Sequence, residues 1–325
     1  MLKCIFFSAI LLVSSMALRA QTQTQMPAHI GIIYPISTNG VHAGKVSNRF
    51  SLHAIAGLSR GERGVALAGF ALVVRDSATG LQASGFLNRI GSAHGVQLAG
   101  FANSTGTQHG FCAAGFANIS RDSADGQVAG FINKAREARF QAAGFINIAR
   151  KVRGVQLAGL INIADTSDCP IGLINIVRNG ERSVSLSTDE TLTSLISFRS
   201  GGRKLYGIIG GGYNGKTGKT LYAWEAGLGA HFYIGSAFRI NTEIATIGLT
   251  DFKNGLSSRQ TLRVLPAVHL SRHTEFFVGP TFNHVDSRQA IDGGLVTHYI
   301  WSRNESNQRT QGLFFGGIAG LNILL

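Results

Sequence analysis

The sequence predicts an all-β protein in which a β-solenoid of 15-residue repeats precedes an eight-stranded antiparallel β-barrel of the outer-membrane type. Three observations predict this fold class. A motif centred on one glycine recurs eight times within residues 64–180, and apolar and polar residues then alternate through residues 181–325. Glycine, with 42 of 325 residues, is too frequent for a mainly helical chain, because each glycine costs a helix about 1 kcal/mol.

The first 20 residues are typical of a secretory signal peptide. Lys3 supplies a positive charge, and the apolar run Ile5–Ala17 is too short to cross a membrane as a helix. A buried N-terminal helix is the alternative interpretation. No other run is long and apolar enough for a helical span, so we expect an exported protein that meets a membrane only through β-strands or its surface. Residues 21–63 are predicted to form a short N-terminal β segment.

Each copy of the repeat in residues 64–180 has a rigid and a variable part. Gly95–Asn103 reads GVQLAGFAN and Gly154–Asn162 reads GVQLAGLIN. The stretch from the Gln position to the Asn position keeps its seven residues, and all variation in length falls between copies. Strands tolerate no insertion whereas turns do, so the rigid part is predicted to be paired. Cys112 and Cys169 stand three residues before their glycines, where the other complete copies have Gln.

An asparagine three residues after the central glycine favours parallel stacking of the copies. In a parallel solenoid, equivalent residues stack about 4.8 Å apart and can hydrogen-bond one another as a ladder. In an antiparallel meander, which is the alternative fold, such residues would meet only two strands away. The predicted ladder is structural rather than catalytic and comprises Asn88, Asn103, Asn118, Asn133, Asn147, Asn162 and Asn175.

The alternation after residue 181 predicts strands with one apolar and one polar face. Every even position from Tyr222 to Ile234 is apolar. Such strands, joined by alternating short and long connections, are typical of outer-membrane barrels, although a soluble sandwich also alternates. The connections predict eight strands with both ends in the periplasm, although Leu295–Trp301 could add another strand. The polar face is predicted to point into the lumen, where four side chains would neutralise one another: Glu225, Arg239, Glu243 and Arg263.

The repeats and strands together resemble the glycine-rich surface-repeat proteins of Gram-negative bacteria, whose copies are similar to GVQLAGLVN. The resemblance covers roughly residues 50–215. That family is largely uncharacterised, so the resemblance implies a non-enzymatic β protein of the cell envelope and no specific task. The sequence departs from the usual barrel pattern at its end, where Leu325 stands in place of an aromatic residue.

Three motifs suggest other chemistry, but their surroundings do not support it. Gly210–Thr217 fits the P-loop pattern, yet a strand pattern follows where a helix is required. His269 and His273 flank a predicted turn, without a helix to align them on a metal. Glu225 and Glu243 resemble a catalytic carboxylate pair, but Arg239 and Arg263 favour ion pairs. We therefore predict no catalytic residue, no metal site and no cofactor.

The predicted function is a structural or interaction role at the outer membrane, with membrane lipid as a partner and the repeats in the periplasm. The net charge is +13, and many cations fall in the variable turns: Arg121, Lys134, Arg136, Arg139, Arg150, Lys151 and Arg153. They form either a solvated rim or a site for lipopolysaccharide or another envelope protein. Nucleic acid is not expected, because aromatic residues are not interleaved with these cations. One alternative is a small-solute pore through the barrel, although side chains usually fill the interior of an eight-stranded barrel. The other is a secreted enzyme with a site on the solenoid face.

Overall fold

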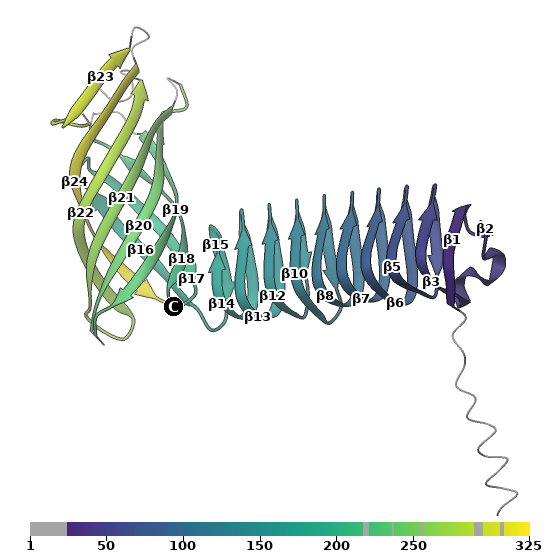
Figure 1. The fold of residues 1–325 in the computed structure, drawn as a ribbon. Helices are drawn as coiled ribbons and strands as arrows, with labels where there is room; N and C mark the ends of the chain where they lie inside the picture. The colour runs from purple at the N-terminus through teal and green to yellow at the C-terminus, as the bar shows by residue number, and fades with distance from the viewer. Residues whose placement is uncertain (1–24, 217–220, 236, 254–255, 289–294, 306–308) are drawn as a thin grey trace, which may run out of the picture. The chain divides into compact units, whose positions relative to one another are not determined.

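The computed structural model describes residues 25–216, 221–235, 237–253, 256–288, 295–305 and 309–325. The predicted signal peptide, residues 1–20, lies outside the described residues. The protein is nearly all β, with a parallel solenoid and a closed antiparallel barrel, which confirms the predicted fold class. The chain forms two compact units that divide after Gly100. Figure 1 draws the strands of the solenoid and of the barrel with their labels. None of the described helices is long and apolar enough to cross a membrane.

The first unit is a stack of parallel strands that begins before the sequence repeat does. β1 pairs in parallel with β3, β3 with β5, β5 with β6 and β6 with β7. Residues of the predicted N-terminal segment therefore form coils of their own, although their sequence does not match the motif. The elements are β1 Gln25–Ile33, β2 Ile36–Ser37, the 3-10 helix Gly40–Lys45, β3 Ser47–His53, β4 Ala56–Ser59, β5 Gly61–Ala68, β6 Ala71–Ser84 and β7 Leu87–Ala99.

The second unit starts with further coils of the same kind. Asn103 lies opposite Asn118 and Asn133 opposite Asn147 in parallel register, so the antiparallel meander is excluded. Taken together, the parallel-strand coils make about nine turns. The strands of this part are β8 Ala102–Ala114, β9 Ala117–Ser120, β10 Ser123–Ala129, β11 Ile132–Lys134, β12 Glu137–Ala143, β13 Ile146–Ala158, β14 Ile161–Ile171 and β15 Ile174–Val177.

Close stacking at one corner of each coil explains the glycine of the motif. A Cβ atom on Gly130 would collide with the carbonyl oxygen of Gly115, and one on Gly159 with that of Gly144. Any other residue would push neighbouring coils apart at this corner. The interior is correspondingly narrow and is filled mainly by small apolar side chains such as Ala124, Ala138, Ala149 and Val152. The residue after the glycine then faces outward.

The last coil corrects one position of the predicted repeat. Cys112 lies opposite Gln127 as predicted, but Pro170 rather than Cys169 lies opposite Gln156. Leu157 pairs with Ile171 and Ile161 with Ile174, so the last coil has one residue fewer at its glycine corner. Counting three residues back from Gly172 therefore gives Cys169, whereas the residue opposite Gln156 is Pro170.

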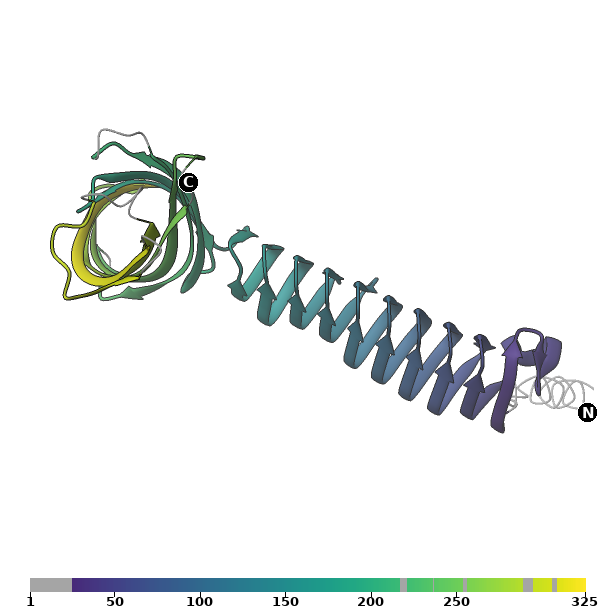
Figure 2. The same ribbon diagram turned by 90° about the horizontal axis from the view of Figure 1, so that it is seen from above.

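Residues 181–324 form a closed ring of eight antiparallel strands (Figure 2). The ring closes where β16 pairs with β24. β23 (Trp301–Glu305) overlaps the expected extra strand by one residue and pairs with β24 outside the ring, so the count of eight holds. The ring strands are β16 Glu181–Asp189, β17 Thr193–Gly201, β18 Leu205–Asn214, β19 Leu221–Tyr233, β20 Phe238–Thr250, β21 Leu256–His269, β22 Thr274–Arg288 and β24 Arg309–Leu324.

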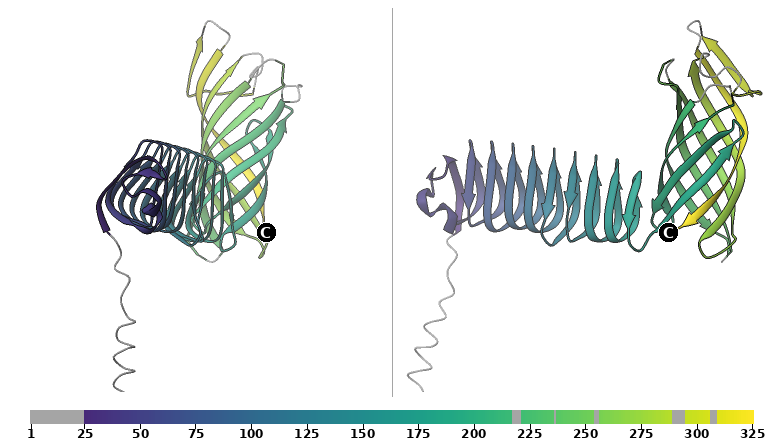
Figure 3. Two further views of the ribbon diagram at one scale, coloured as in Figure 1. Left: turned by 90° about the vertical axis from the view of Figure 1, so that its right-hand side faces the viewer. Right: turned by 180° about the vertical axis from the view of Figure 1, so that it is seen from behind.

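The two ends of the barrel differ in their connections. The first residue of β16 and the last of β24 lie at the end that carries the connections 202–204, 234–237 and 270–273 (Figure 3). We call this the terminal end. The opposite end, the loop end, carries 190–192, 215–220, 251–255 and the long connection 289–308, which contains β23.

Candidate functional site

The outer surface of the barrel is an apolar belt. Along β19, Tyr222, Trp224, Leu228 and Phe232 point outward and are 39–54% exposed. Ten residue steps of about 3.4 Å on a strand tilted by about 40° give a height of about 26 Å, close to the 25 Å apolar band of transmembrane barrels. The belt also includes Leu186, Ile196, Ile209, Tyr213, Ile244, Leu262, Val264, Val268, Phe276, Val278, Phe282, Phe315, Leu321 and Ile323.

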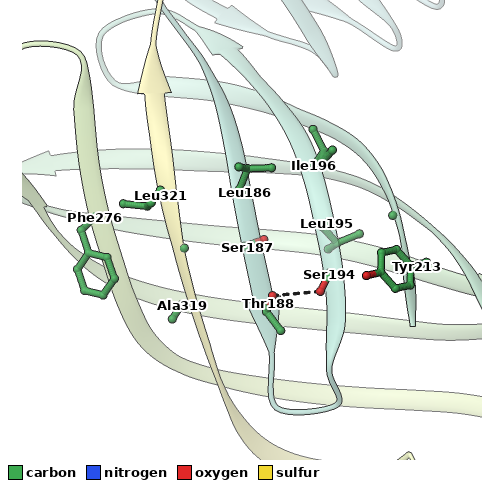
Figure 4. Close-up of a pocket in the computed structure, with 12 residues that line it drawn as sticks. Leu186, Ser187, Thr188, Ser194, Leu195, Ile196, Tyr213, Phe276, Ala319 and Leu321 are labelled. Carbon is green, nitrogen blue, oxygen red and sulfur yellow. Dashed lines mark hydrogen bonds between the residues drawn. The ribbon is translucent and has the colours of Figure 1, made fainter. Parts of the chain in front are cut away.

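A shallow groove of about 480 Å³ crosses the belt over β22, β24, β16, β17 and β18 (Figure 4). Its floor includes the small side chains of Thr188, Ser194 and Ala319, and Leu186 and Phe276 stand beside it. The hydroxyls of Thr188 and Ser194 are 3.1 Å apart and hydrogen-bond each other. The groove therefore offers an apolar surface whose hydroxyls are already paired.

Three of the four predicted lumen residues form one network at the middle of the barrel. Arg263 Nη2 lies 2.6 Å from Glu225 Oε1, and Arg263 Nη1 donates to Glu243 Oε2 at 3.1 Å. Arg199 Nε and the Tyr206 hydroxyl each donate to Glu243 Oε1 at 2.8 Å. The four charged side chains are at most 5% exposed. Two arginines and two glutamates cancel one another, so this central cluster is neutral and water does not reach it.

The fourth predicted residue, Arg239, belongs to a separate cluster near the terminal end. Its Nε lies 2.6 Å from Glu275 Oε2, and its Nη2 lies 2.8 Å from Glu181 Oε1. Arg239 precedes Glu243 by four residues on β20, which separates their Cα atoms by about 14 Å. The expectation that the four residues neutralise one another thus fails for Arg239, which takes nearer carboxylates.

A third cluster lies near the loop end, where Arg259 pairs with Asp189 and lies 3.5 Å from Glu190. Neither this cluster nor Arg199, Glu181 and Glu275 is among the predicted lumen residues. Their signal was available: Arg199, Arg259 and Glu275 occupy inward positions of strands that alternate, as their burial shows.

Inside the solenoid, five of the predicted ladder contacts occur as hydrogen bonds between asparagine side chains. Each Nδ2 donates to the Oδ1 of the next asparagine at 2.8–3.0 Å, from Asn103 through Asn118, Asn133, Asn147 and Asn162 to Asn175. Asn88, in the first unit, donates to the carbonyl oxygen of Leu98 at 2.7 Å. A second ladder joins Gln156 to Gln141 at 3.0 Å and Gln141 to Gln127 at 2.8 Å.

A buried polar cluster replaces the asparagine ladder in the first coils. The carboxylate of Glu62 accepts hydrogen bonds from Ser51 at 2.8 Å and from Asn48 at 3.1 Å, and the rings of His29 and His53 meet edge to face at 4.5 Å. Burial raises the pKa of Glu62, although these hydrogen bonds oppose the shift. Burial and the neighbouring His53 lower the pKa of His29 to about 4. All five side chains are at most 3% exposed, so the cluster has no access for a substrate.

The predicted basic turns carry interleaved acids. Arg139 lies 3.5 Å from Asp125, and Arg153 lies 3.5 Å from Glu137. Arg150 lies 3.7 Å from Asp165. Exposed pairs of this kind contribute little to stability, but they reduce the positive potential that the cations present.

The last coil packs directly against the barrel wall within the second unit. The backbone N–H of Asn175 donates to the Ser200 hydroxyl at 2.9 Å, and Asn175 Nδ2 donates to the Ser200 carbonyl at 3.0 Å. A Cβ atom on Gly207 would collide with the carbonyl oxygen of Gly172. Beside this contact lies a cavity of about 650 Å³, which includes Cys169 and Lys204 in its lining.

The remaining motifs adopt the structures that their surroundings predict. Gly210–Asn214 belong to β18, and the next described strand is β19, so the P-loop pattern has no helix at its end. His269 lies 3.6 Å from Glu275. Within the described part of the chain, no group of three or more His, Cys, Asp or Glu side chains is arranged to hold a metal ion.

Comparison with known proteins identifies no relative by sequence. No family model and no curated protein matches the chain. Among solved structures, the chain is similar to one from the de novo design of transmembrane β-barrels, with 12% identity and a TM-score of 0.25. The match covers 45% of this chain and 93% of the other.

Proposed function

We propose that this protein is an exported, non-enzymatic component of the cell envelope whose barrel anchors it in the outer membrane and holds the solenoid as an interaction arm. One observation carries the proposal: the barrel is apolar outside over about 26 Å and sealed by buried ion pairs inside. A water-soluble barrel would have the reverse arrangement, because charged side chains would cover its outer surface. In the described part of the barrel strands, outward charged side chains lie near the rims, at Arg182, Asp286 and Arg309.

The interior supports an anchor rather than a pore. Arg199, Glu225, Glu243 and Arg263 fill the middle of the barrel, and their charges are paired at 2.6–3.1 Å. A conducting lumen would need water at this level, and these side chains exclude it.

The connections support a periplasmic solenoid. Both ends of the barrel chain lie at the terminal end, and the long connection 289–308 lies at the loop end. Outer-membrane barrels place short turns in the periplasm and long loops outside the cell. The arm would then meet periplasmic or membrane components, including lipopolysaccharide or another envelope protein if its basic turns bind anions.

Fractionation of cells that produce the full chain, combined with electrophoresis with and without heating, tests the anchor. We expect the protein in the outer-membrane fraction, with a mobility that changes on heating because the folded barrel resists detergent. Recovery in the soluble fraction would contradict the proposal. Reconstitution into a planar bilayer tests the sealed lumen. We expect no steady conductance, and discrete openings of uniform size would favour the pore instead.

A further inference from the structure

The glycine corner of the solenoid carries an exposed row of stacked aromatic rings. In the second unit, the rings of Phe101, Phe116, Phe131 and Phe145 lie 4.8–4.9 Å apart with interplanar angles of 0–3°. Each is 39–41% exposed. Leu160 and Leu173 continue the row, half-buried, in the last two coils. We call these six residues the phenylalanine edge.

Both strand faces beside this edge are apolar as well. On the face before the glycine, Phe111, Phe140 and Leu157 are 38–44% exposed. On the face after it, Ile119 and Ile176 are 44% and 45% exposed. A soluble protein rarely exposes so long an apolar surface, so this surface requires a cover.

Charge is confined largely to the opposite edge of the same coils. Arg121, Arg136, Arg139, Arg150, Lys151 and Arg153 lie there, all exposed. Lys134 lies on an apolar face, where its long stem can carry the amine toward water. The solenoid of the second unit is thus amphipathic around its own axis.

Contacts with the barrel fix where the phenylalanine edge lies. The chain of the last coil runs along β18: a Cβ atom on Gly202, at the terminal end, would lie 3.0 Å from Pro170, and Gly207, farther up the wall, touches Gly172 and Leu173. The next outward residue after Gly207 is Ile209 of the apolar belt. The phenylalanine edge is therefore displaced from the terminal end toward the belt. β8, β10, β12, β13 and β14 each end two residues before a residue of this edge.

From this arrangement we infer that the phenylalanine edge lies in the surface of the lipid bilayer that surrounds the barrel, so that the solenoid of the second unit rests along the membrane with its charged edge in water. The inference rests on the proposed function, because it requires an embedded barrel. Its distinct support is the continuity of the edge with the belt, since a layer of lipid that covers Ile209 also reaches Leu173. A second copy of the chain that covered the phenylalanine edge would have to lie at the same height along the barrel as the lipid around Ile209.

Fluorophores at single cysteines test the inference in the full chain. The background is Cys4→Ser with Cys169→Ser, and Cys112, which is only 1% exposed, is expected to stay unlabelled in the folded protein. The sites are Phe131→Cys on the edge, Arg136→Cys on the charged edge and Val278→Cys on the belt. The protein is reconstituted into vesicles of phosphatidylethanolamine and phosphatidylglycerol that contain lipids with a nitroxide on the acyl chain.

We expect nitroxide lipids to quench the Phe131→Cys label at least about threefold more than the Arg136→Cys label, as for an interfacial apolar surface. Strong quenching at Val278→Cys with equal, weak quenching at the two solenoid sites would overturn this inference and leave the anchor intact. Weak quenching at all three sites would overturn both. Shielding of Phe131→Cys that grows with the protein-to-lipid ratio would show that a second copy covers the edge instead. Phe116→Cys repeats the measurement one coil away, in case one substitution perturbs the fold.

Discussion

The side-chain amide of Asn118 donates a hydrogen bond to the side-chain oxygen of Asn133, one coil further along the solenoid, at 2.9 Å. The same Nδ2 also donates to the carbonyl oxygen of Val128 at 2.7 Å. One residue type thus fills two needs of a narrow interior: it links neighbouring coils and satisfies a backbone carbonyl that points inward. Buried polar groups require such partners, which explains why the position is occupied by asparagine in seven copies.

Asn133→Ala is expected to lower the free energy of unfolding by about 1–3 kcal/mol. The substitution removes the bonds of Asn133 with Asn118, Asn147 and the carbonyl of Ala142, and it leaves their buried groups unpaired. The measurement is denaturant unfolding followed by circular dichroism. Lys134→Ala, at the adjacent exposed position of the same strand, is the matched control and should change stability by less than about 0.5 kcal/mol. Equal losses for the two variants would show that the ladder does not stabilise the coils.

Gly130→Ala is expected to destabilise the solenoid by about 1–3 kcal/mol, because the new Cβ atom collides with the carbonyl oxygen of Gly115 and the coils must separate. Gly126→Ala provides the control, because Gly126 lies within β10, the strand that ends just before Gly130. A Cβ atom there meets Phe111 Cδ2 at 3.3 Å, and that exposed ring can move. Thermal unfolding should therefore separate the two variants clearly. If Gly126→Ala were the more harmful, the corner would not be the tight point of the coil.

Arg263→Met is expected to destabilise the barrel by about 3–5 kcal/mol, because it leaves Glu225 and Glu243 with one arginine, Arg199, in a buried interior. The double variant Arg263→Met with Glu225→Gln restores a neutral central cluster and should recover part of that loss. Urea unfolding in detergent micelles, read from heat-dependent mobility, measures both. A double variant less stable than Arg263→Met would contradict the charge argument.

Much of this architecture could be predicted from sequence because it depends on periodicity. The spacing of the repeat predicted which residues lie opposite one another in neighbouring parallel coils. The alternation of apolar and polar residues correctly placed Glu225, Glu243 and Arg263 inside the barrel. The choice of partners could not be predicted in the same way. Arg239 pairs with Glu181, 58 residues earlier in the chain, because ring closure brings the first barrel strand close to it. Closure is a property of the whole ring and leaves no local signal.

The start of the stack and the register of the last coil show the same limit at the solenoid ends. β1 and β3 stack like the later coils, although Ser47–His53 lacks the motif and buries Ser47, Asn48, Ser51 and His53. At the other end, the shortened corner before Ile174 shifts Cys169 by one position. One side of each end coil packs against a cap or the barrel and not against another repeat. The residues of the end coils therefore meet different contacts and depart from the repeat motif.

The first coils are expected to loosen as the pH falls from 6.5 toward 4. The unfolded chain binds a proton on His29 near the ordinary pKa of 6.5, whereas the folded chain does so only near 4, so acid favours unfolding across this window. His53, whose pKa is also lowered by burial, acts in the same direction. Glu62 acts in the opposite direction, because its raised pKa favours the folded state when it is protonated, and it offsets part of the effect.

Hydrogen exchange at several pH values, corrected for the intrinsic rate, measures this loosening. Protection of β1 should fall toward pH 4, while protection of β13, far from any of these groups in sequence, should not. His29→Gln should flatten the dependence in β1. An unchanged profile in that variant would assign the effect to His53 or to another group.

Cys112 and Cys169 are expected to remain free thiols even in an oxidising compartment. Cys112 lies opposite Gln127 in the next coil. The equivalent positions in the following three coils are Gln141, Gln156 and Pro170, and Pro170 is the neighbour of Cys169. Those four steps of about 4.8 Å place the two cysteines about 19 Å apart, whereas a disulfide requires Cα atoms within about 7 Å. The parallel register therefore forbids a bridge within the chain.

Alkylation of the non-reduced protein followed by mass spectrometry tests both the spacing and the burial. Cys169, half-buried in the last coil, should react in the folded protein. Cys112 should react only after unfolding, because burial both covers the thiol and raises its pKa to about 12, which removes the reactive thiolate. The unfolded sample, in which both residues react, is the control. A Cys112–Cys169 peptide pair in the folded sample would be incompatible with parallel coils, since no rearrangement short of unstacking four of them brings the two sulfur atoms together.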